Sequence, residues 1–439
     1  MSQRPGRSVR RLAVLASLSL GAVALAGCSS GGGQAANGGS WSLPTKDPTA
    51  TIHVLSTFAL DTTTGMKDFL DTFHKEHPTI TVKYDVVPFD SLNNTVDSRV
   101  GNKSGSPDLY WADQPRIASL AARGEAEDLT KQFSQYKGAF DPASYESGIY
   151  NDKLWALPMT NSTQLLFYNK DLLKAAGLTP PSADPDDRMS WEQLDTDAVK
   201  AKAAGAQYGF MFEQVDRYYQ LEPLGVSLGG SPGVKGSDNL TPDITSQAWV
   251  DAMNWYGKIF ADGASARGVA VEQTIPDFLA GKTAYFVDGP WLVDRLKASK
   301  VDWGVALQPK FESGKAVTPD GSWSVAMNPF SKQKEAAGIF MKAMTVDNGY
   351  VGDLPANVEG KKEYFARDLF ASPEGQVAAK IVDYETSNTA VNRPTTVGYI
   401  EFESILNATF ADIRNGADPK TSLEKASDSL VKAWAKYKK

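Results

Sequence analysis

The sequence is poor in cysteine and histidine. Among its 439 residues it has one cysteine, Cys28, and three histidines. A lone thiol excludes an intramolecular disulfide, so the folded state depends on burial, for which 42% hydrophobic residues supply the material. His74 and His77 stand close together but have no third ligand in the pattern of a zinc site. We therefore expect no metal and no cofactor.

No apolar run is long enough to cross a membrane. Residues 12–25 are apolar for about fourteen positions, whereas a spanning helix needs about 20. A basic start precedes this run and Leu-Ala-Gly-Cys ends it at Cys28, an order typical of a lipoprotein secretion signal. The alternatives are an uncleaved anchor or an ordinary secretory signal. We expect residues 1–27 to be a lipoprotein signal peptide and the lipidated Cys28 to hold the protein on the extracytoplasmic face of the bacterial cell membrane.

The sequence also lacks an excess of positive charge. Its 52 acidic and 45 basic residues give a net charge of −7, with no basic block, which argues against a nucleic-acid partner. Residues 28–47 are rich in glycine and serine and predict a flexible tether. The remaining length exceeds one typical hydrophobic core and predicts two domains.

Hydrophobic periodicity indicates an α/β fold. Apolar residues alternate around positions 52–56, 80–86 and 108–112, which predicts strands, and recur at helical spacing around 66–73, 92–100 and 115–123. Alternating strands and helices predict a doubly wound, mainly parallel sheet. Ligands of such sheets bind beyond the carboxyl ends of the strands. This rule points to residues 56–61 and 111–113.

Three catalytic patterns occur in the sequence without their required context. Gly-x-Ser-x-Gly appears at 225–229 and at 229–233, but no histidine follows either one. Gly-Lys-Thr at 281–283 lacks the first glycine of a phosphate-binding loop. A carboxylate pair for glycoside hydrolysis is not excluded, although nothing singles out one acid pair. We expect a protein that is not an enzyme.

Ten tryptophans are many for this length, and three stand at predicted strand ends beside polar residues. Trp111 precedes Asp113, Trp291 follows Asp288, and Trp323 follows an Asp-Gly-Ser run. A sugar presents an apolar face to aromatic rings and hydroxyl groups to carboxylates. These three positions favour a carbohydrate ligand. Four other tryptophans are assigned to the core: Trp155, Trp249, Trp255 and Trp434.

Several short motifs stand in a defined order. They are Pro-Asp-Leu-Tyr-Trp-Ala-Asp at 107–113, Trp-Ala-Leu-Pro at 155–158, Leu-Phe-Tyr-Asn-Lys-Asp-Leu at 166–172, Ala-Gly-Leu at 176–178, Ser-Trp-Glu-Gln-Leu at 190–194, Phe-Leu-Ala-Gly-Lys-Thr-Ala at 278–284 and Gly-Pro-Trp at 289–291. In these motifs, and in its closing helix, the chain resembles the maltose-binding-protein-like family of extracellular sugar-binding proteins of ABC importers.

The resemblance implies a two-lobe, periplasmic-binding-protein-like α/β fold, in which each lobe is a mainly parallel sheet flanked by helices. It places residues 48–158 and 324–380 in one lobe and residues 159–323 and 381–439 in the other. Crossings between the lobes are expected near residues 158–163, 323–328 and 381–389. The ligand is expected between the lobes, which close on it.

The resemblance and the strand-end aromatics together give the expected ligand-binding residues: Asp61, Trp111, Asp113, Ser162, Glu213, Asp216, Tyr218, Tyr219, Asp288, Trp291, Trp323, Arg393 and Tyr399. Three alternatives stay open. Either Tyr218 or Tyr219 supplies an aromatic contact, and Glu213 competes with Asp216 for a polar role. Arg393 either reaches a sugar hydroxyl or forms an ion pair between lobes.

The implied function is capture of a mono- or oligosaccharide for the transmembrane subunits of an ABC permease, by a monomer that makes and breaks no bond. Ser162 or Thr163 stands where the type protein of the family has a glutamate, so the recognised hydroxyl pattern is expected to differ. The alternatives are a secreted glycoside-acting enzyme and a two-lobe binder of a solute that is not a sugar.

Overall fold

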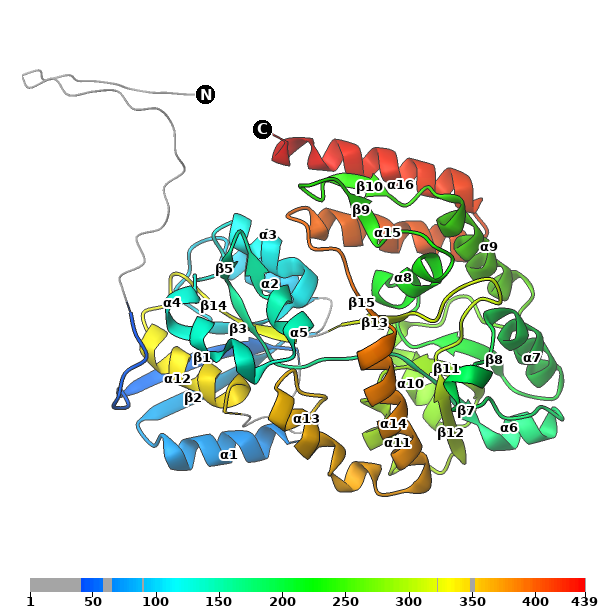
Figure 1. Cartoon of the computed structure of the whole chain (residues 1–439), viewed down its shortest axis with the longest axis horizontal. Helices are drawn as coiled ribbons and strands as arrows, with labels where there is room; N and C mark the ends of the chain where they lie inside the picture. Colours follow the sequence, from blue (N-terminus) through cyan, green and yellow to red (C-terminus); the bar gives the residue numbers. More distant parts are fainter. Residues whose placement is uncertain (1–40, 58–64, 89–90, 322, 348–351, 439) are drawn as a thin grey trace, which may run out of the picture. The chain divides into compact units, whose positions relative to one another are not determined.

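The computed structural model describes residues 41–57, 65–88, 91–321, 323–347 and 352–438. The predicted signal peptide, Cys28 and Asp61 lie outside the described residues, as does most of the predicted tether. In the described part, two larger sheets are each flanked by helices (Figure 1). No helix of that part is both long and apolar enough to span a bilayer.

The first sheet has five strands in the order β2-β1-β3-β14-β6. Its strands are β1 (Ala50–Ser56), β2 (Ile80–Val86), β3 (Leu109–Asp113), β6 (Ala156–Pro158) and β14 (Trp323–Met327). Strand β1 pairs in parallel with both β2 and β3, so that Leu55 lies between Asp85 and Tyr110. The strands predicted near 52–56, 80–86 and 108–112 are confirmed.

The second sheet has four strands in the order β12-β7-β11-β8. Its strands are β7 (Leu165–Asn169), β8 (Tyr208–Phe212), β11 (Thr283–Asp288) and β12 (Trp303–Leu307). Every residue of β7 and β11 is buried, as expected for central strands covered on both faces. Three two-stranded pairs complete the described strands: β4 (Ile149–Tyr150) with β5 (Lys153–Leu154), β9 (Gly233–Lys235) with β10 (Thr241–Asp243), and β13 (Thr318–Asp320) with β15 (Ala390–Asn392).

Among the described strands, each larger sheet contains one strand that runs against the others. In the first sheet it is β14, which is antiparallel to β3 and β6. In the second it is β7, which is antiparallel to β11 and β12. Each of these strands directly follows a passage of the chain from one larger sheet to the other, from β6 to β7 and from β12, by way of β13, to β14. The predicted two-lobe α/β fold with mainly parallel sheets is confirmed.

The helices surround the two sheets in chain order. They are α1 (Met66–Glu76), α2 (Leu92–Arg99), α3 (Ile117–Ala122), α4 (Thr130–Phe133), α5 (Pro142–Ser147), α6 (Lys170–Ala175), α7 (Trp191–Ala203), α8 (Tyr218–Ser227), α9 (Gln247–Ala261), α10 (Val271–Leu279), α11 (Leu292–Leu296), α12 (Lys334–Thr345), α13 (Val358–Phe365), α14 (Pro373–Asn388), α15 (Tyr399–Arg414) and α16 (Pro419–Trp434). The predicted starts of α7 and α16 are confirmed by hydrogen bonds to their capping side chains. Ser190 accepts from the Gln193 N–H at 3.0 Å, and Asp418 from the Thr421 N–H at 2.8 Å.

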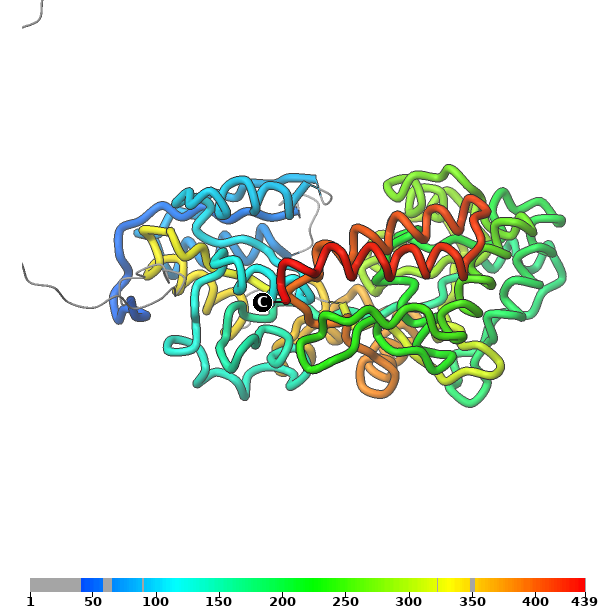
Figure 2. The backbone as a smooth tube through the Cα atoms, turned by 90° about the horizontal axis from the view of Figure 1, so that it is seen from above, coloured from blue at the N-terminus to red at the C-terminus, as the bar shows by residue number. Residues whose placement is uncertain are grey.

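Helices α15 and α16 run side by side and antiparallel near the end of the chain, as both views show (Figures 1 and 2). The Trp434 ring stacks on Phe402 with the ring centroids 6.2 Å apart, and its indole N–H donates to the Gly398 carbonyl at 2.9 Å. Trp434 is therefore a core residue with its polar atom satisfied, as its helical position predicted.

Buried side chains define two groups of elements, which we call lobes. The first lobe is the first sheet with the helices that share its core, including α1 and α12. The second lobe is the second sheet with its helices, including α7, α9, α15 and α16. Helices α13 and α14 also pack with the second sheet, through Tyr364, Ala378 and Ile381. This packing favours a third crossing near residues 354–357 over one near 381–389; the lobe boundaries themselves stay a prediction.

The end of the predicted tether differs from a free linker. Trp41 is 8% exposed and belongs to the first lobe's core. Its indole N–H donates to Glu127 at 3.0 Å, and its carbonyl accepts from Gln132 at 2.8 Å. A buried, hydrogen-bonded tryptophan fixes this segment, so the tether expected over residues 28–47 does not extend through Trp41.

Candidate functional site

An arginine–carboxylate pair joins the two lobes at the carboxyl end of β3. Asp113 ends this strand, and Arg393 directly follows β15. Two hydrogen bonds of 2.7 and 2.5 Å link the guanidinium of Arg393 to the two carboxylate oxygens of Asp113. The side chains are 6% and 15% exposed. Of the two roles considered for Arg393, the structure therefore places it in an ion pair between lobes.

Tyr219 lies under the same guanidinium. The Arg393 carbon at the centre of its charge is 5.2 Å from the centroid of the Tyr219 ring, a distance at which a cation and an aromatic face attract each other. Tyr219 belongs to the first turn of α8 and is 8% exposed. Asp113, Arg393 and Tyr219 therefore form one contiguous group drawn from three separate parts of the chain.

The Tyr219 hydroxyl is held by a chain of side-chain hydrogen bonds. It lies 2.8 Å from Ser162 Oγ, which itself donates to the Gly321 carbonyl, and it accepts from Gln164 Nε2 at 3.2 Å. Gln164 Oε1 in turn accepts from Gln220 Nε2 at 2.7 Å. A Cβ on Gly321 would lie 2.2 Å from the Tyr219 ring, so this close approach requires glycine. The predicted site residue Ser162 is therefore linked to Asp113, Arg393 and Tyr219 by its hydrogen bond with the Tyr219 hydroxyl.

Tyr218 packs into the core of the second lobe, whereas Tyr219 lies under the Arg393 guanidinium. The Tyr218 ring is 4.8 Å from that of Phe402 and also faces Trp249, and its hydroxyl donates to the Pro232 carbonyl at 2.6 Å. Adjacent helical residues point about 100° apart, so only one of the two tyrosines could face Arg393. Of the two tyrosines, Tyr219 is the one whose ring lies under Arg393; which of them contacts a ligand stays a prediction.

Tyr399 is completely buried at the start of α15. Its hydroxyl has no hydrogen-bond partner. Burial raises its pKa, and the nearby Arg393 charge opposes that shift. Tyr399 thus belongs to the group around Arg393, but it presents no surface in this conformation.

Glu213 directly follows β8, and Asp288 ends β11, the neighbouring parallel strand of the second sheet. Burial raises the pKa of both carboxyls, and the nearby Glu213 raises that of Asp288 further. One oxygen of Asp288 accepts from the Gly289 N–H at 2.6 Å, while Glu213 Oε2 and Asp288 Oδ2 are buried without a partner. These two acids form a pair in which at least one proton is retained more strongly than in water.

Asp216, the competitor of Glu213 for a polar site role, is held by structural contacts. Its carboxylate accepts from the Tyr256 hydroxyl at 2.6 Å and pairs with Arg414 at 3.2 Å. Its φ of 64° is in the left-handed region that aspartate tolerates better than most residues. These bonds tie the start of α8 to α9 and α15; a ligand role for Asp216 stays a prediction.

Two of the three strand-end tryptophans are half-buried, and one is not. Trp291 caps α11, and a Cβ on the preceding Gly289 would lie 2.1 Å from its ring, so the ring is packed over that glycine. Trp323 starts β14 directly opposite Asp113 in the sheet register. Trp111 is only 1% exposed, with its ring 6.2 Å from that of Trp323. Trp111 therefore supports Trp323 and offers no free face in this conformation.

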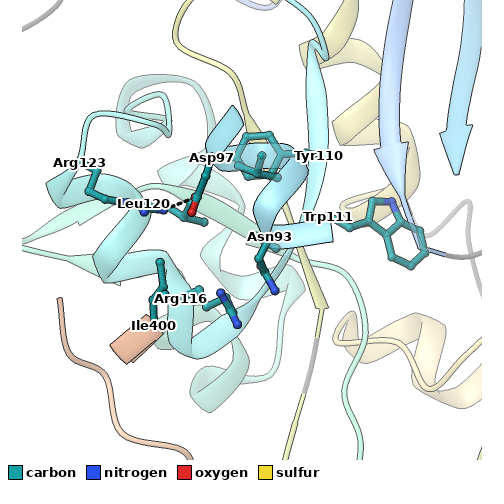
Figure 3. Close-up of a pocket in the computed structure, with 10 residues that line it drawn as sticks. Asn93, Asp97, Tyr110, Trp111, Arg116, Leu120, Arg123 and Ile400 are labelled. Atoms are coloured by element: carbon teal, nitrogen blue, oxygen red, sulfur yellow. Dashed lines mark hydrogen bonds and ion pairs between the residues drawn. The ribbon is translucent and has the colours of Figure 1, made fainter. Parts of the chain in front are cut away.

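A small pocket lies between α2, β3, α3 and the start of α15 (Figure 3). Asn93, Asp97, Arg116 and Arg123 supply its polar lining. Figure 3 shows the indole of Trp111 directed away from these side chains. Tyr110 and Trp111 are its aromatic lining residues, and Trp111 alone of the predicted ligand residues lines it. Elsewhere in the described part of the chain, no three of the residue types His, Cys, Asp and Glu gather as metal ligands would.

Five residues of the Arg393 surroundings were not predicted: Gln164, Gln220, Glu222, Asp320 and Glu403. All but Glu403 are buried, between 0% and 7% exposed. The polar run at 160–164, between two apolar segments, was the available signal for Gln164, because such a run must find internal partners. Glu222 and Asp320 carry no such signal, because the Arg393 charge near them comes from a distant segment of the chain.

Comparison with known proteins agrees with this architecture. The sequence profile described as "Bacterial extracellular solute-binding protein" matches residues 60–350. The chain is 26% identical to the galactooligosaccharide-binding protein of Bacillus subtilis, over 83% of this chain and 85% of that protein. It is 25% identical to the maltodextrin-binding protein MdxE of the same organism, over 85% and 86% of the two chains.

Solved structures share the fold. The ABC substrate-binding protein Lmo0181 from Listeria monocytogenes, in complex with cycloalternan, matches with a TM-score of 0.76 at 20% identity, covering 87% of this chain and 98% of that one. The GacH receptor of Streptomyces glaucescens matches with a TM-score of 0.75 at 24% identity, covering 88% and 99%. Because the family profile spans more than half of its length, the chain belongs to the bacterial extracellular solute-binding protein family.

Proposed function

We propose that this protein is the carbohydrate-capturing subunit of an ABC importer, which binds a mono- or oligosaccharide between its two lobes and delivers it to a membrane permease. The proposal rests mainly on the relatives named for galactooligosaccharide and maltodextrin binding, which align with 83% and 85% of the chain. The protein makes and breaks no bond in this function. It works as a monomer, and sugar binding makes the closed arrangement of the lobes dominant.

The site chemistry supports a polyhydroxyl ligand. Asp113, Trp291 and Trp323 stand at strand ends, where ligands of α/β sheets bind. Carboxylate oxygens accept hydrogen bonds from sugar hydroxyls, and half-buried indole rings cover the apolar faces of sugar rings. Tyr219 contributes its ring, because its hydroxyl is already engaged by Ser162 and Gln164.

Cleavage before Cys28 and lipidation of its thiol would anchor the protein to the outer face of the cell membrane. A relative from Streptococcus pneumoniae, 26% identical, is named a solute-binding lipoprotein. The lipobox pattern of residues 25–28 supports the same chemistry here. Such an anchor keeps a capture subunit close to its permease.

A thermal-shift screen against a sugar panel, followed by calorimetric titration, tests this function. A ligand at about 100 times its Kd stabilises the folded state by roughly 2.7 kcal/mol. We expect a stabilising sugar, one site per chain and an unchanged sugar after recovery. Release of reducing ends would indicate a glycoside-acting enzyme. Stabilisation by non-sugar solutes alone would indicate a different cargo.

A further inference from the structure

Two ion pairs connect the lobes on the same side of β3. The first is Arg393 with Asp113. The second is Arg116, just beyond β3, with Glu403 of α15; their side chains are 11% and 20% exposed. In each pair one partner stands at the end of the first lobe's central strand and the other follows β15. Separation of the lobes would break both pairs together.

Arg393 also faces two buried acids of its own lobe. Asp320 ends β13, which pairs in parallel with β15, so Asp320 lies opposite Asn392 and beside Arg393. Glu222 lies three residues after Tyr219 on α8, and therefore on the same face of that helix. Asp320 Oδ1 and both carboxylate oxygens of Glu222 have no hydrogen-bond partner. Asp320 is 7% exposed, and Glu222 is fully buried.

Burial favours the protonated forms of these acids, and the positive charge of Arg393 opposes it. Burial raises the pKa of Asp320 to about 7; Arg393 and Lys361 oppose this shift, and Asp141 adds to it. Burial also raises the pKa of Glu222 well above its ordinary value, against Arg393 and the Tyr218 hydroxyl, with Asp320 adding to it.

Arg393 also lies near the Glu403 carboxyl, in addition to Asp113 and the Tyr399 hydroxyl.

We propose that Arg393 is a positioning residue with two alternative sets of partners: Asp113 when the lobes are joined, and Asp320 with Glu222 when they separate. The inference rests on the proposed function, because it regulates the closure that capture requires. A buried guanidinium without a counter-charge is strongly unfavourable. Departure of Asp113 therefore leaves Arg393 to the carboxyls of its own lobe, of which Asp320 and Glu222 ionise and release protons.

The exchange links closure to pH. The joined form binds more protons than the separated form, so a lower pH favours closure and a higher pH favours opening. For one linked proton, the ratio of joined to separated molecules changes by up to tenfold for each pH unit between the two pKa values of the acid. The window lies between the ordinary range of carboxylic acids, about pH 4, and about pH 7 for Asp320.

Small-angle X-ray scattering of the sugar-free full chain, with Cys28→Ser to prevent lipidation, tests the proposal at pH 5.5, 7.0 and 8.5. The radius of gyration should increase with pH. The double variant Asp320→Asn with Glu222→Gln should be compact and insensitive to pH, because neither acid can release a proton to Arg393. A double variant that expands with pH as the parent does would overturn the proposal.

Two further variants keep the result interpretable. Asp113→Asn removes the more exposed partner without disturbing the buried acids, and it should expand the protein at all three pH values; a compact Asp113→Asn protein at pH 5.5 contradicts the switch. Asp71→Asn removes an exposed carboxylate that pairs with Lys67, and its pH response should match that of the parent.

Calorimetric sugar binding is measured separately, so a sugar-binding protein without a pH response refutes the switch alone. A pH response without sugar binding refutes the function alone.

Discussion

The hydroxyl of Tyr219 lies 2.8 Å from Ser162 Oγ, and this contact joins helix α8 to the segment that links the two sheets. Ser162 Oγ also donates a hydrogen bond to the carbonyl of Gly321, which lies on the second segment that links the two sheets. Tyr219 is therefore fixed against both passages of the chain between the lobes. Its ring, with Arg393 above it, keeps one orientation.

Replacing Tyr219 with phenylalanine should lower the free energy of unfolding by about 1–3 kcal/mol, the cost of leaving buried polar groups unpaired. The variant keeps the ring but leaves Gln164 Nε2 without its acceptor. Urea unfolding measures the change. In the double variant with Gln164→Leu, the second substitution should cost less than it does alone. Strict additivity of the two losses would contradict the hydrogen-bond chain.

Trp291→Ala should weaken sugar binding by roughly 2 kcal/mol, or about 30-fold in Kd, as expected for an aromatic anchor. The matched control is Trp155→Ala, another half-buried tryptophan, whose indole N–H donates to the Tyr150 carbonyl at 2.8 Å in the first lobe. Titration calorimetry on both variants separates a contact from a general effect. Equal affinities of the Trp291 variant and the parent would remove this residue from the site.

Local sequence patterns predicted much of the fold but fewer features of the candidate site. Alternation and helical spacing predicted β1, α1 and β2 because each of these elements buries one face whose period is visible in the sequence. Strand ends then pointed to Asp113. The direction of a single side chain was not predictable in the same way, as the pair Tyr218 and Tyr219 illustrates: the sequence offered both, and helix phase decided between them.

Contacts between distant segments were the least predictable part of the site. Arg393 and Asp113 are 280 positions apart, and no local period relates them. The acids at Glu222 and Asp320 are equally dependent on tertiary placement. Pro223 beside Glu222 and the short strand that ends at Asp320 indicate neither burial nor a common partner.

The buried ion pair of Arg188 and Glu385 should be essential for stability. Arg188 Nη1 and Nη2 donate to the two carboxylate oxygens at 2.7 and 3.1 Å, with side chains 2% and 0% exposed. Glu385→Gln should lower the free energy of unfolding by about 3–5 kcal/mol, because it leaves a buried guanidinium charge uncompensated. The exposed pair Lys362–Glu359 is the control, and Glu359→Gln should leave the urea midpoint unchanged. Similar midpoints for both variants would contradict this prediction.

Cys28→Ser should leave sugar affinity intact and change only where the protein resides, because Cys28 precedes every described core residue. In cells, the parent should fractionate with membranes and the variant should not. Membrane fractionation of the serine variant would exclude lipid on this thiol as the anchor.

The acid pair Glu213 and Asp288 should make the folded state less stable as pH rises. Burial raises the pKa of Glu213 from 4.5 to about 7 and that of Asp288 well above its ordinary value. Between pH 4.5 and 7 the folded chain therefore holds a proton that the unfolded chain has released. One such proton lowers the free energy of unfolding by roughly 1.4 kcal/mol for each pH unit gained. Glu213→Gln removes the contribution of Glu213 to this pH dependence. The free energy of unfolding of the variant, measured in urea, should therefore fall less steeply between pH 5 and 7 than that of the parent. Parallel profiles for the two proteins would show that the acid pair holds no extra proton.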